Sequence, residues 1–166
     1  MPSKNPLVAV VMGSTSDAEI MKLSMGLLDE LSIPYEVNIT SAHRTPQQTK
    51  DFAEKAMDRG IEVIIAGAGW SAHLAGVIAA HTLLPVIGVP IDSSVLNGMD
   101  ALLSTVQMPP GIPVATVAIG KGGAENASIL AAQILALKYP DIANNLRSYR
   151  ENLTKKAIEK AKNWKG

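Results

Sequence analysis

The sequence contains no cysteine. This absence excludes a disulfide scaffold, a metal or iron–sulfur site with cysteine ligands, and a thiol nucleophile. It also fits a reducing compartment, and we expect the protein to be cytoplasmic. The formal net charge is zero, because 15 Lys and Arg residues balance 15 Asp and Glu residues. A balanced surface argues against nucleic acid or another polyanion as the partner.

Charge is also scarce in the middle of the chain. Between Val63 and Gly120 the only charged residues are Asp92 and Asp100, fewer than a small monomer should present to water. Either a membrane segment or burial against other subunits would explain this. The uncharged stretch 63–91 is interrupted by histidines, prolines and glycines, which disfavours a membrane span. Acidic residues also follow the first apolar run too closely for a signal peptide. We therefore expect no membrane partner and burial between subunits.

The chain has 166 residues, 47% of them hydrophobic, enough for one domain with a full core. Apolar runs typical of doubly covered strands alternate with helical periodicity. The expected strands are 7–12, 34–39, 63–66, 86–89 and 114–119. The expected helices are 20–31, 46–60, 72–81, 96–106 and 120–136. This alternation predicts an α/β fold with a parallel sheet and helices on both faces, in the flavodoxin-like order 2-1-3-4-5; spacing alone leaves other doubly wound orders open.

Two helical segments carry more specific expectations. The second helix should bury a stripe that includes Phe52 and Met57 and should end at Gly60. Beyond Pro140, apolar residues recur at helical spacing among many charges. We expect a domain at 1–140 and a C-terminal helical extension of the same domain at 141–166, packed on its own domain or reaching a neighbouring subunit. A basic RNA-binding tail is the alternative, although acidic residues interrupt the basic ones.

The topology predicts where a ligand binds. In an open parallel sheet, ligands bind outside the carboxyl ends of the strands, near the point where strand order reverses. The loops that meet there are 13–17, 41–45 and 67–73, after the first three strands.

The first loop has two interpretations. The hydroxyls of Ser14, Thr15 and Ser16 and free backbone N–H groups at a helix start can bind a phosphate. Ser16 or Asp17 can equally well be a simple helix cap. Asp17 would repel a phosphate and suits sugar hydroxyls better. The Walker loop and the three-glycine dinucleotide fingerprint are both missing, which favours a mononucleotide or a sugar phosphate.

The second loop places His43 beside Arg44. Histidine exchanges a proton near neutral pH, and arginine binds a carboxylate or phosphate through two hydrogen bonds. His73, just past the third loop, is either a second acid/base group or a residue that orients the first. His81 lies in a helical pattern and is interpreted as structural. Scattered histidines without a carboxylate at ligand spacing argue against a metal site.

Two glycine-rich turns remain. The third loop, 68–72, has small residues that let the backbone approach a ligand closely. The turn 120–123 is either a phosphate cradle or a tight turn from the fifth strand into its helix.

Four segments resemble one known family. They are Val10–Asp17, Ser41–Pro46, Ile65–Gly69 followed by Ala72-His73-Leu74, and Gln107–Val114. Together they are similar to N5-carboxyaminoimidazole ribonucleotide mutase of de novo purine synthesis, in order, from about Val8 to Leu137. Trp70 and Ala75 stand where that family is expected to have a small residue and a proline.

The resemblance implies a flavodoxin-like three-layer fold, a homo-octamer and active sites formed between subunits. It also implies a reaction that moves a carboxylate from the exocyclic nitrogen of an aminoimidazole ribonucleotide to ring carbon four, without a metal or other cofactor. A related class that carboxylates aminoimidazole ribonucleotide directly with carbon dioxide is the same-fold alternative. A non-enzymatic nucleotide-binding module is the second alternative to the mutase.

The resemblance also implies roles for single residues. His43 would be the proton donor and acceptor, and Ser14, Asp17 and Arg44 would bind substrate. The remaining pocket residues would be Ser16, Ser41, Gly69, His73 and Leu74. We further expect Ala42, Ala68, Gly69 and Ala72 to form a small uncharged pocket that excludes water and retains carbon dioxide.

Overall fold

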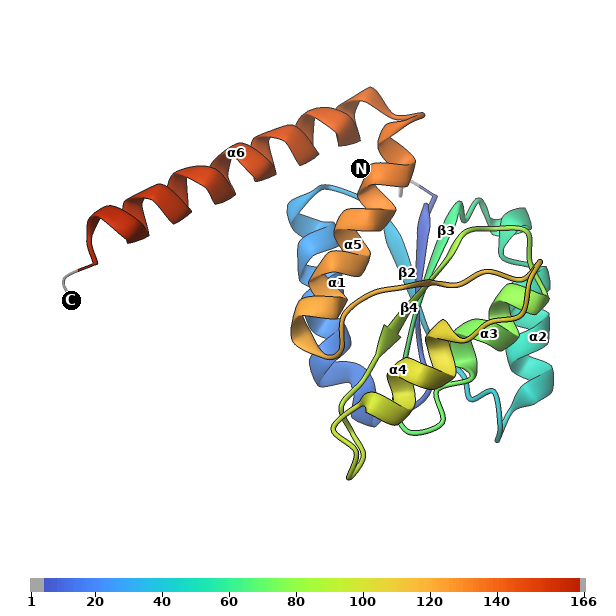
Figure 1. Cartoon of the computed structure of the whole chain (residues 1–166). Coiled ribbons are helices and arrows are strands. Elements are labelled where there is room, and N and C mark those ends of the chain that lie inside the picture. Colours follow the sequence, from blue (N-terminus) through green and yellow to red (C-terminus); the bar gives the residue numbers. More distant parts are fainter. Residues whose placement is uncertain (1–4, 165–166) are drawn as a thin grey trace.

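The computed structural model describes residues 5–164 as a three-layer α/β/α domain with a helical extension (Figure 1). All strand pairs in its five-stranded sheet are parallel, and the strand order is β2-β1-β3-β4-β5, which confirms the predicted fold and order. The strands are β1 Val8–Met12, β2 Tyr35–Ile39, β3 Val63–Ala68, β4 Val86–Pro90 and β5 Ala115–Thr116. The strand order reverses at β1, which pairs with both β2 and β3.

Helices cover both faces of the sheet (Figure 1). They are α1 Ala18–Glu30, α2 Pro46–Glu54, α3 Leu74–Ala80, α4 Met99–Val106, α5 Lys121–Ala136 and α6 Pro140–Lys162, with short 3-10 turns at Thr15–Asp17 and Met57–Arg59. Helices α1 and α5 pack side by side on one face, and α2 and α3 lie on the other.

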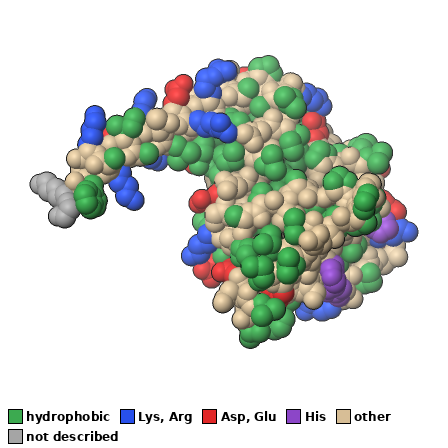
Figure 2. Space-filling model, in the orientation of Figure 1, with side chains coloured by type: hydrophobic (Ala, Val, Ile, Leu, Met, Phe, Trp, Pro, Cys, Tyr) green, Lys and Arg blue, Asp and Glu red, His purple; other side chains and the backbone are tan. Residues whose placement is uncertain are grey.

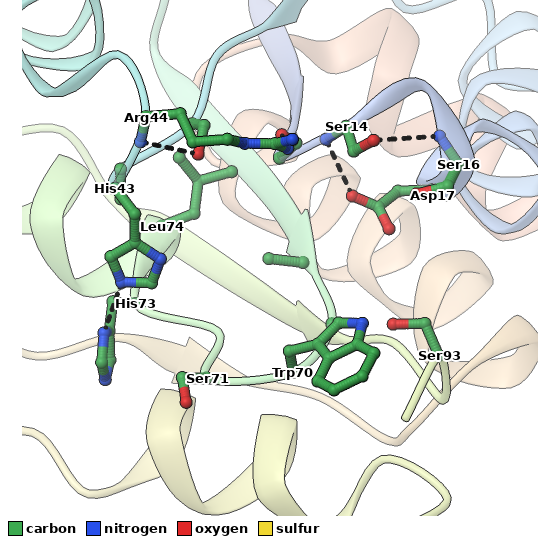
Figure 3. A pocket seen from close by; sticks show the side chains of 15 residues that line it. Ser14, Ser16, Asp17, His43, Arg44, Trp70, Ser71, His73, Leu74 and Ser93 are labelled. Atoms are coloured by element: carbon green, nitrogen blue, oxygen red, sulfur yellow. Dashed lines mark hydrogen bonds between the residues drawn. The ribbon is translucent and has the colours of Figure 1, made fainter. Parts of the chain in front are cut away.

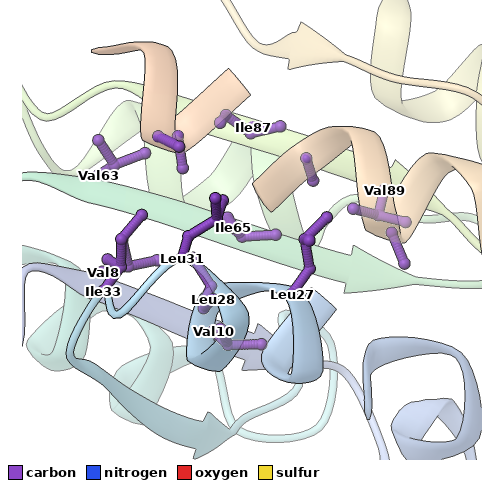
Figure 4. Packing of buried hydrophobic residues seen from close by; sticks show 14 of the residues in the cluster. Val8, Val10, Leu27, Leu28, Leu31, Ile33, Val63, Ile65, Ile87 and Val89 are labelled. Atoms are coloured by element: carbon purple, nitrogen blue, oxygen red, sulfur yellow. The ribbon is translucent and has the colours of Figure 1, made fainter. Parts of the chain in front are cut away.

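The alternation of side chains along β1 explains why the domain has two hydrophobic cores, one on each face of the sheet. Val8 and Val10 belong to the core with Leu28 of α1 and residues of α5 (Figure 4), whereas Ala9 and Val11 belong to the core with Phe52 of α2. Successive side chains of a strand point to opposite faces, so an unbroken apolar run is required when both faces are buried. All five residues of β1 are buried.

Several predicted elements are shorter than expected, including the third and fourth helices, and two differ most. The fifth strand was predicted at 114–119, but β5 covers only Ala115–Thr116. It lies at the sheet edge and pairs with β4 alone. The Val117 N–H still donates to the Gly88 carbonyl at 3.0 Å, but the next bond to β4 comes only from the Gly120 N–H, to the Pro90 carbonyl at 2.9 Å, so the regular ladder stops before α5. The second helix ends at Glu54, and a 3-10 turn continues to Gly60.

The buried stripe predicted for the second helix is only partly confirmed. Phe52 is buried as predicted, but Met57 is 53% exposed. In a continuous helix Met57 would lie on the same face as the buried Ala53, four residues earlier, but α2 ends at Glu54, so the side chain of Met57 leaves that face.

Helix α6 has two parts. Ile142 and Leu146 are buried in the core that α1 and α5 form, whereas every residue from Arg150 to Trp164 is exposed. Figure 1 shows this second part projecting away from the domain. Between residues 5 and 164, none of the helices combines the length and the apolar character that a membrane span needs.

Candidate active site

A cavity of about 720 Å³ lies where the carboxyl ends of β1, β2 and β3 meet. Its walls come from the three loops predicted from topology. All of the site residues predicted from the sequence line it: Ser14, Ser16, Asp17, Ser41, His43, Arg44, Gly69, His73 and Leu74. Of the four small residues predicted to form an uncharged pocket, Ala42, Ala68 and Gly69 line the cavity, whereas Ala72 is buried behind it.

Two histidines from different loops meet at this cavity. Nε2 of His43 lies 2.8 Å from Nδ1 of His73, and the two rings are nearly perpendicular, at 88°. His43 belongs to the turn between β2 and α2, and His73 immediately precedes α3. In Figure 3 the other ring nitrogen of His43, Nδ1, is on the side that faces the cavity. One ring nitrogen of His43 therefore contacts His73, and the other is on the cavity side, where a ligand could exchange a proton with it.

A threonine cluster holds the His43 turn in place. The Thr45 hydroxyl accepts a hydrogen bond from the Ser41 N–H at 2.9 Å and lies within hydrogen-bond distance of the Ser41 carbonyl and of Thr40 Oγ1. Thr40 and Thr49 are buried and hydrogen-bonded at 2.8 Å. Thr45 is the N-cap residue of α2, but its side chain makes no cap bond to the helix because it closes the preceding turn instead.

The first loop is a capping box. The Ser14 N–H donates to the Asp17 carboxylate at 3.0 Å, and the Ser16 N–H donates to the Ser14 hydroxyl at 3.3 Å (Figure 3). Ser14 caps the 3-10 turn Thr15–Asp17, and Asp17 supplies the reciprocal bond of the box. Asp17 also stands at the N-cap position of α1, as one interpretation expected, but its side chain makes no cap bond to that helix. These two backbone N–H groups are occupied, so the loop offers a ligand mainly its side-chain hydroxyls.

Arg44 links the second loop to the first. Its guanidinium donates to the Gly13 carbonyl at 3.4 Å, although the side chain remains exposed. Burial raises the pKa of Asp17 above its ordinary value, while the hydrogen bond from Ser14 and the charge of Arg44 act in the opposite direction. The cavity thus has a cationic group, Arg44, above an anionic acceptor, Asp17 (Figure 3).

The structure adds Trp70, Ser71 and Ser93 to the lining. Ser93 lies in the loop after β4, which ends at Pro90, so the rule that strand ends meet at one edge could have found it. Trp70 has a backbone φ of 55° and is 64% exposed. A left-handed backbone costs a residue with a Cβ about 1–2 kcal/mol, and this conformation has no signal in the sequence.

The remaining predicted features lie elsewhere. Within residues 5–164, no group of three or more His, Asp or Glu side chains is arranged to hold a metal ion. His81 lies outside the cavity, with Nδ1 at 3.9 Å from Glu54. The turn 120–123 does not line the cavity either; a Cβ on Gly123 would lie 1.7 Å from the Ala118 carbonyl oxygen, which supports the tight-turn interpretation.

Comparisons with known proteins show the family to which the chain belongs. The family described as AIR carboxylase matches residues 7–156. N5-carboxyaminoimidazole ribonucleotide mutase of Pyrococcus horikoshii is 57% identical over 162 residues, covering 98% of this chain and 90% of that protein. The protein of the same name from Bacillus subtilis is 58% identical over 154 residues, covering 93% of this chain and 95% of that protein.

A solved structure agrees as well. Treponema denticola PurE superposes with a TM-score of 0.85 at 32% identity, over 97% of this chain and 99% of that one. The chain therefore belongs to the AIR carboxylase family.

Proposed function

We propose that this chain is an N5-carboxyaminoimidazole ribonucleotide mutase of purine biosynthesis. It would convert N5-carboxyaminoimidazole ribonucleotide to 4-carboxyaminoimidazole ribonucleotide. The observation that carries the proposal is the His43–His73 pair, joined at 2.8 Å in one cavity with Arg44 and Asp17. Relatives 57% and 58% identical across almost the whole chain bear this name, which favours the mutase over the direct carboxylase.

The nucleotide would bind across the first two loops. Arg44 and the hydroxyls of Ser14 and Ser16 suit the phosphate, because a guanidinium forms paired hydrogen bonds to phosphate oxygens. Asp17 suits the ribose hydroxyls, since its carboxylate accepts hydrogen bonds and would repel a phosphate. Arg44 and Asp17 lie in the same cavity, which supports binding of both parts of one ligand.

The histidine pair suits the proton transfers. Nε2–H of His43 can donate to Nδ1 of His73 at 2.8 Å, so Nδ1 of His43 holds the exchangeable proton when the ring is an imidazolium and is the basic nitrogen when the ring is neutral. His73 would then fix the neutral tautomer of His43 whose Nδ1 faces the substrate. His43 would thus be the catalytic residue and His73 a positioning residue.

One histidine can serve both halves of the reaction. His43 protonates the exocyclic nitrogen, the bond from that nitrogen to the carboxylate carbon breaks, and carbon dioxide and the aminoimidazole form. Ring carbon four then attacks the carbon dioxide, and His43 takes the proton that leaves this carbon. The proton given in the first half returns in the second, so the proposal needs no metal, cofactor or net proton.

The rest of the lining would confine the carbon dioxide. Leu74 is buried and supplies an apolar wall, and Ser41 closes the His43 turn. Gly69 approaches Ser93 so closely that an added Cβ would lie 1.7 Å from the Ser93 hydroxyl oxygen. Small residues here leave room for a ligand and little for water.

A homo-octamer would complete the site, and we propose this assembly. His43, Arg44 and His73 are exposed in a single chain, whereas the mechanism requires carbon dioxide to be shielded from water. Large apolar side chains are also exposed on α4 and the loop before it (Figure 2), namely Val95, Leu96, Met99, Leu103 and Val106. Such an apolar surface is typical of a subunit interface.

The domain boundary and the compartment are also proposals. Residues 1–140 would form the catalytic domain and 141–166 its helical extension. Burial of Ile142 and Leu146 supports attachment to the same core, and the exposed part beyond Arg150 is free to reach a neighbour. We propose the cytoplasm as the compartment, where phosphorylated nucleotides are interconverted.

The experiment is an assay of the purified full chain with N5-carboxyaminoimidazole ribonucleotide, in buffer depleted of bicarbonate. A mutase forms 4-carboxyaminoimidazole ribonucleotide under these conditions. Turnover only of aminoimidazole ribonucleotide plus bicarbonate would indicate the direct carboxylase, and binding without turnover of either would indicate a nucleotide-binding module. Light scattering tests the octamer, and a monomeric mass would contradict it.

A further inference from the structure

Trp70 contributes a large aromatic side chain, an indole, to the lining of the active-site cavity. The other lining side chains are small, hydroxylic, charged or imidazole, apart from Leu74. Figure 3 shows the indole between Ser71 and Ser93, on the wall that faces Arg44 and Ser14 across the cavity. The one broad, flat apolar surface of this lining therefore lies opposite the group suited to the phosphate.

The conformation of Trp70 makes this position unusual. Its φ of 55° lies in the left-handed region, which favours glycine, and its side chain is 64% exposed to solvent. Neither backbone preference nor burial in the chain's own core accounts for a tryptophan here. Strained backbone combined with an exposed aromatic ring at a cavity is typical of a ligand contact.

The proposed substrate presents a matching surface. An aminoimidazole is a flat aromatic ring, and indole is the side chain best suited to stack on such a ring. We propose that Trp70 stacks on the aminoimidazole ring of the substrate and selects ligands that carry a flat ring. This inference rests on the proposed function, because it assigns one more contact to the same nucleotide.

The position of Trp70 also suits the reaction. The indole would hold one face of the ring, while His43 approaches from the other side of the cavity (Figure 3). A ring fixed in this way keeps its exocyclic nitrogen and its carbon four within reach of the same histidine. Trp70 would therefore contribute to ring binding and orientation, and Arg44 to binding of the phosphate.

Fluorescence provides a direct test because the chain has two tryptophans, Trp70 and Trp164. Trp164 is 78% exposed near the end of the chain, beyond α6, so Trp164→Phe makes Trp70 the only indole reporter. The full-length W164F protein is titrated with aminoimidazole ribonucleotide, which lacks the migrating carboxylate, and with ribose 5-phosphate, which lacks the ring. We expect saturable quenching by the nucleotide and none by ribose 5-phosphate.

Calorimetry on variants of Trp70 measures the contact. Trp70→Ala should raise the Kd for aminoimidazole ribonucleotide by about 5- to 100-fold, and leave that for ribose 5-phosphate unchanged. Trp70→Phe, which retains a flat ring, should stay within about threefold of the unmodified chain. Trp70→Gly should lose affinity as Trp70→Ala does while melting at the same or a higher temperature, because glycine adopts a positive φ without strain.

The outcomes separate this inference from the proposed function. Equal nucleotide affinity in Trp70→Ala and the unmodified chain would overturn the stacking while leaving the mutase intact. An equal loss of affinity for the nucleotide and ribose 5-phosphate would also overturn it, since the effect would then come from the loop. If the unmodified chain neither binds nor converts an aminoimidazole ribonucleotide, the proposed function fails and this inference fails with it.

Discussion

Nε2 of His43 lies 2.8 Å from Nδ1 of His73, although 30 residues separate them in the sequence. The contact exists because β1 pairs with β2 on one side and with β3 on the other, so the loops that follow β2 and β3 lie on either side of β1. The sheet topology thereby brings the two histidines into one cavity. The first two predictions concern this pair.

Replacing His43 tests the proton transfers. His43→Asn should lower kcat by about 100- to 10,000-fold, the usual contribution of a general acid or base, while the Kd for aminoimidazole ribonucleotide changes little. Steady-state kinetics and calorimetry measure the two quantities, and the melting temperature checks folding. Turnover close to that of the unmodified chain would refute the role of His43.

Replacing His73 tests the orienting hydrogen bond. His73→Phe removes the acceptor of this hydrogen bond and should lower kcat with little change in KM, and it should also displace the pH–rate profile. His73→Asn can place its side-chain oxygen near the position of Nδ1, and it should recover part of the lost kcat. A role in folding alone would predict lower melting temperatures and an unmoved pH profile in both variants.

The hydroxyl cluster of Thr40, Thr45 and Thr49 should stabilise the turn that carries His43. Thr45→Val leaves the Ser41 N–H without its 2.9 Å acceptor, which should cost about 1–2 kcal/mol of unfolding free energy and raise the KM for the nucleotide. The matched control is Thr154→Val, because the Thr154 hydroxyl bonds only to the Arg150 carbonyl on the exposed part of α6. Urea denaturation compares the two, and similar small losses would contradict a special role for Thr45.

A cluster far from the cavity should make stability depend on acid pH. Burial works to raise the pKa of Glu62, but hydrogen bonds from Lys138 and Tyr139 outweigh it, so this pKa lies below its ordinary value of 4.5. A carboxyl whose pKa is lowered by folding stabilises the protein above its unfolded pKa. That contribution disappears as the pH falls through the folded pKa.

Glu62→Gln should therefore lower the melting temperature by a few degrees at pH 7. The difference from the unmodified chain should shrink as the pH falls below about 4.5. Glu151→Gln, on the exposed part of α6, is the control and should have little effect at either pH. A difference in melting temperature that grows toward acid pH would contradict the assigned direction.

The strands that carry the site could be predicted because their pattern is local. The apolar run at β1 is buried on both faces, and the polar loops after it follow directly. The carboxyl ends of parallel strands lie at the same edge of the sheet, so a common site for the three loops could be predicted. The edge strand was overestimated, because Val114–Ile119 has the composition of a strand and only a tertiary neighbour decides where its pairing stops.

The sequence by itself determined the alternation of strands and helices, the loops that bear His43, Arg44 and His73, and the resemblance to the family, because each rests on residue types and spacing along the chain. Only the tertiary structure decided that Nε2 of His43 contacts His73, that Ser14 and Asp17 form a capping box, and that Trp70 takes a left-handed backbone at the cavity wall. These features depend on how separate loops pack together and on backbone angles such as the φ of Trp70. Neither the packing of loops nor such backbone angles can be inferred from composition or periodicity.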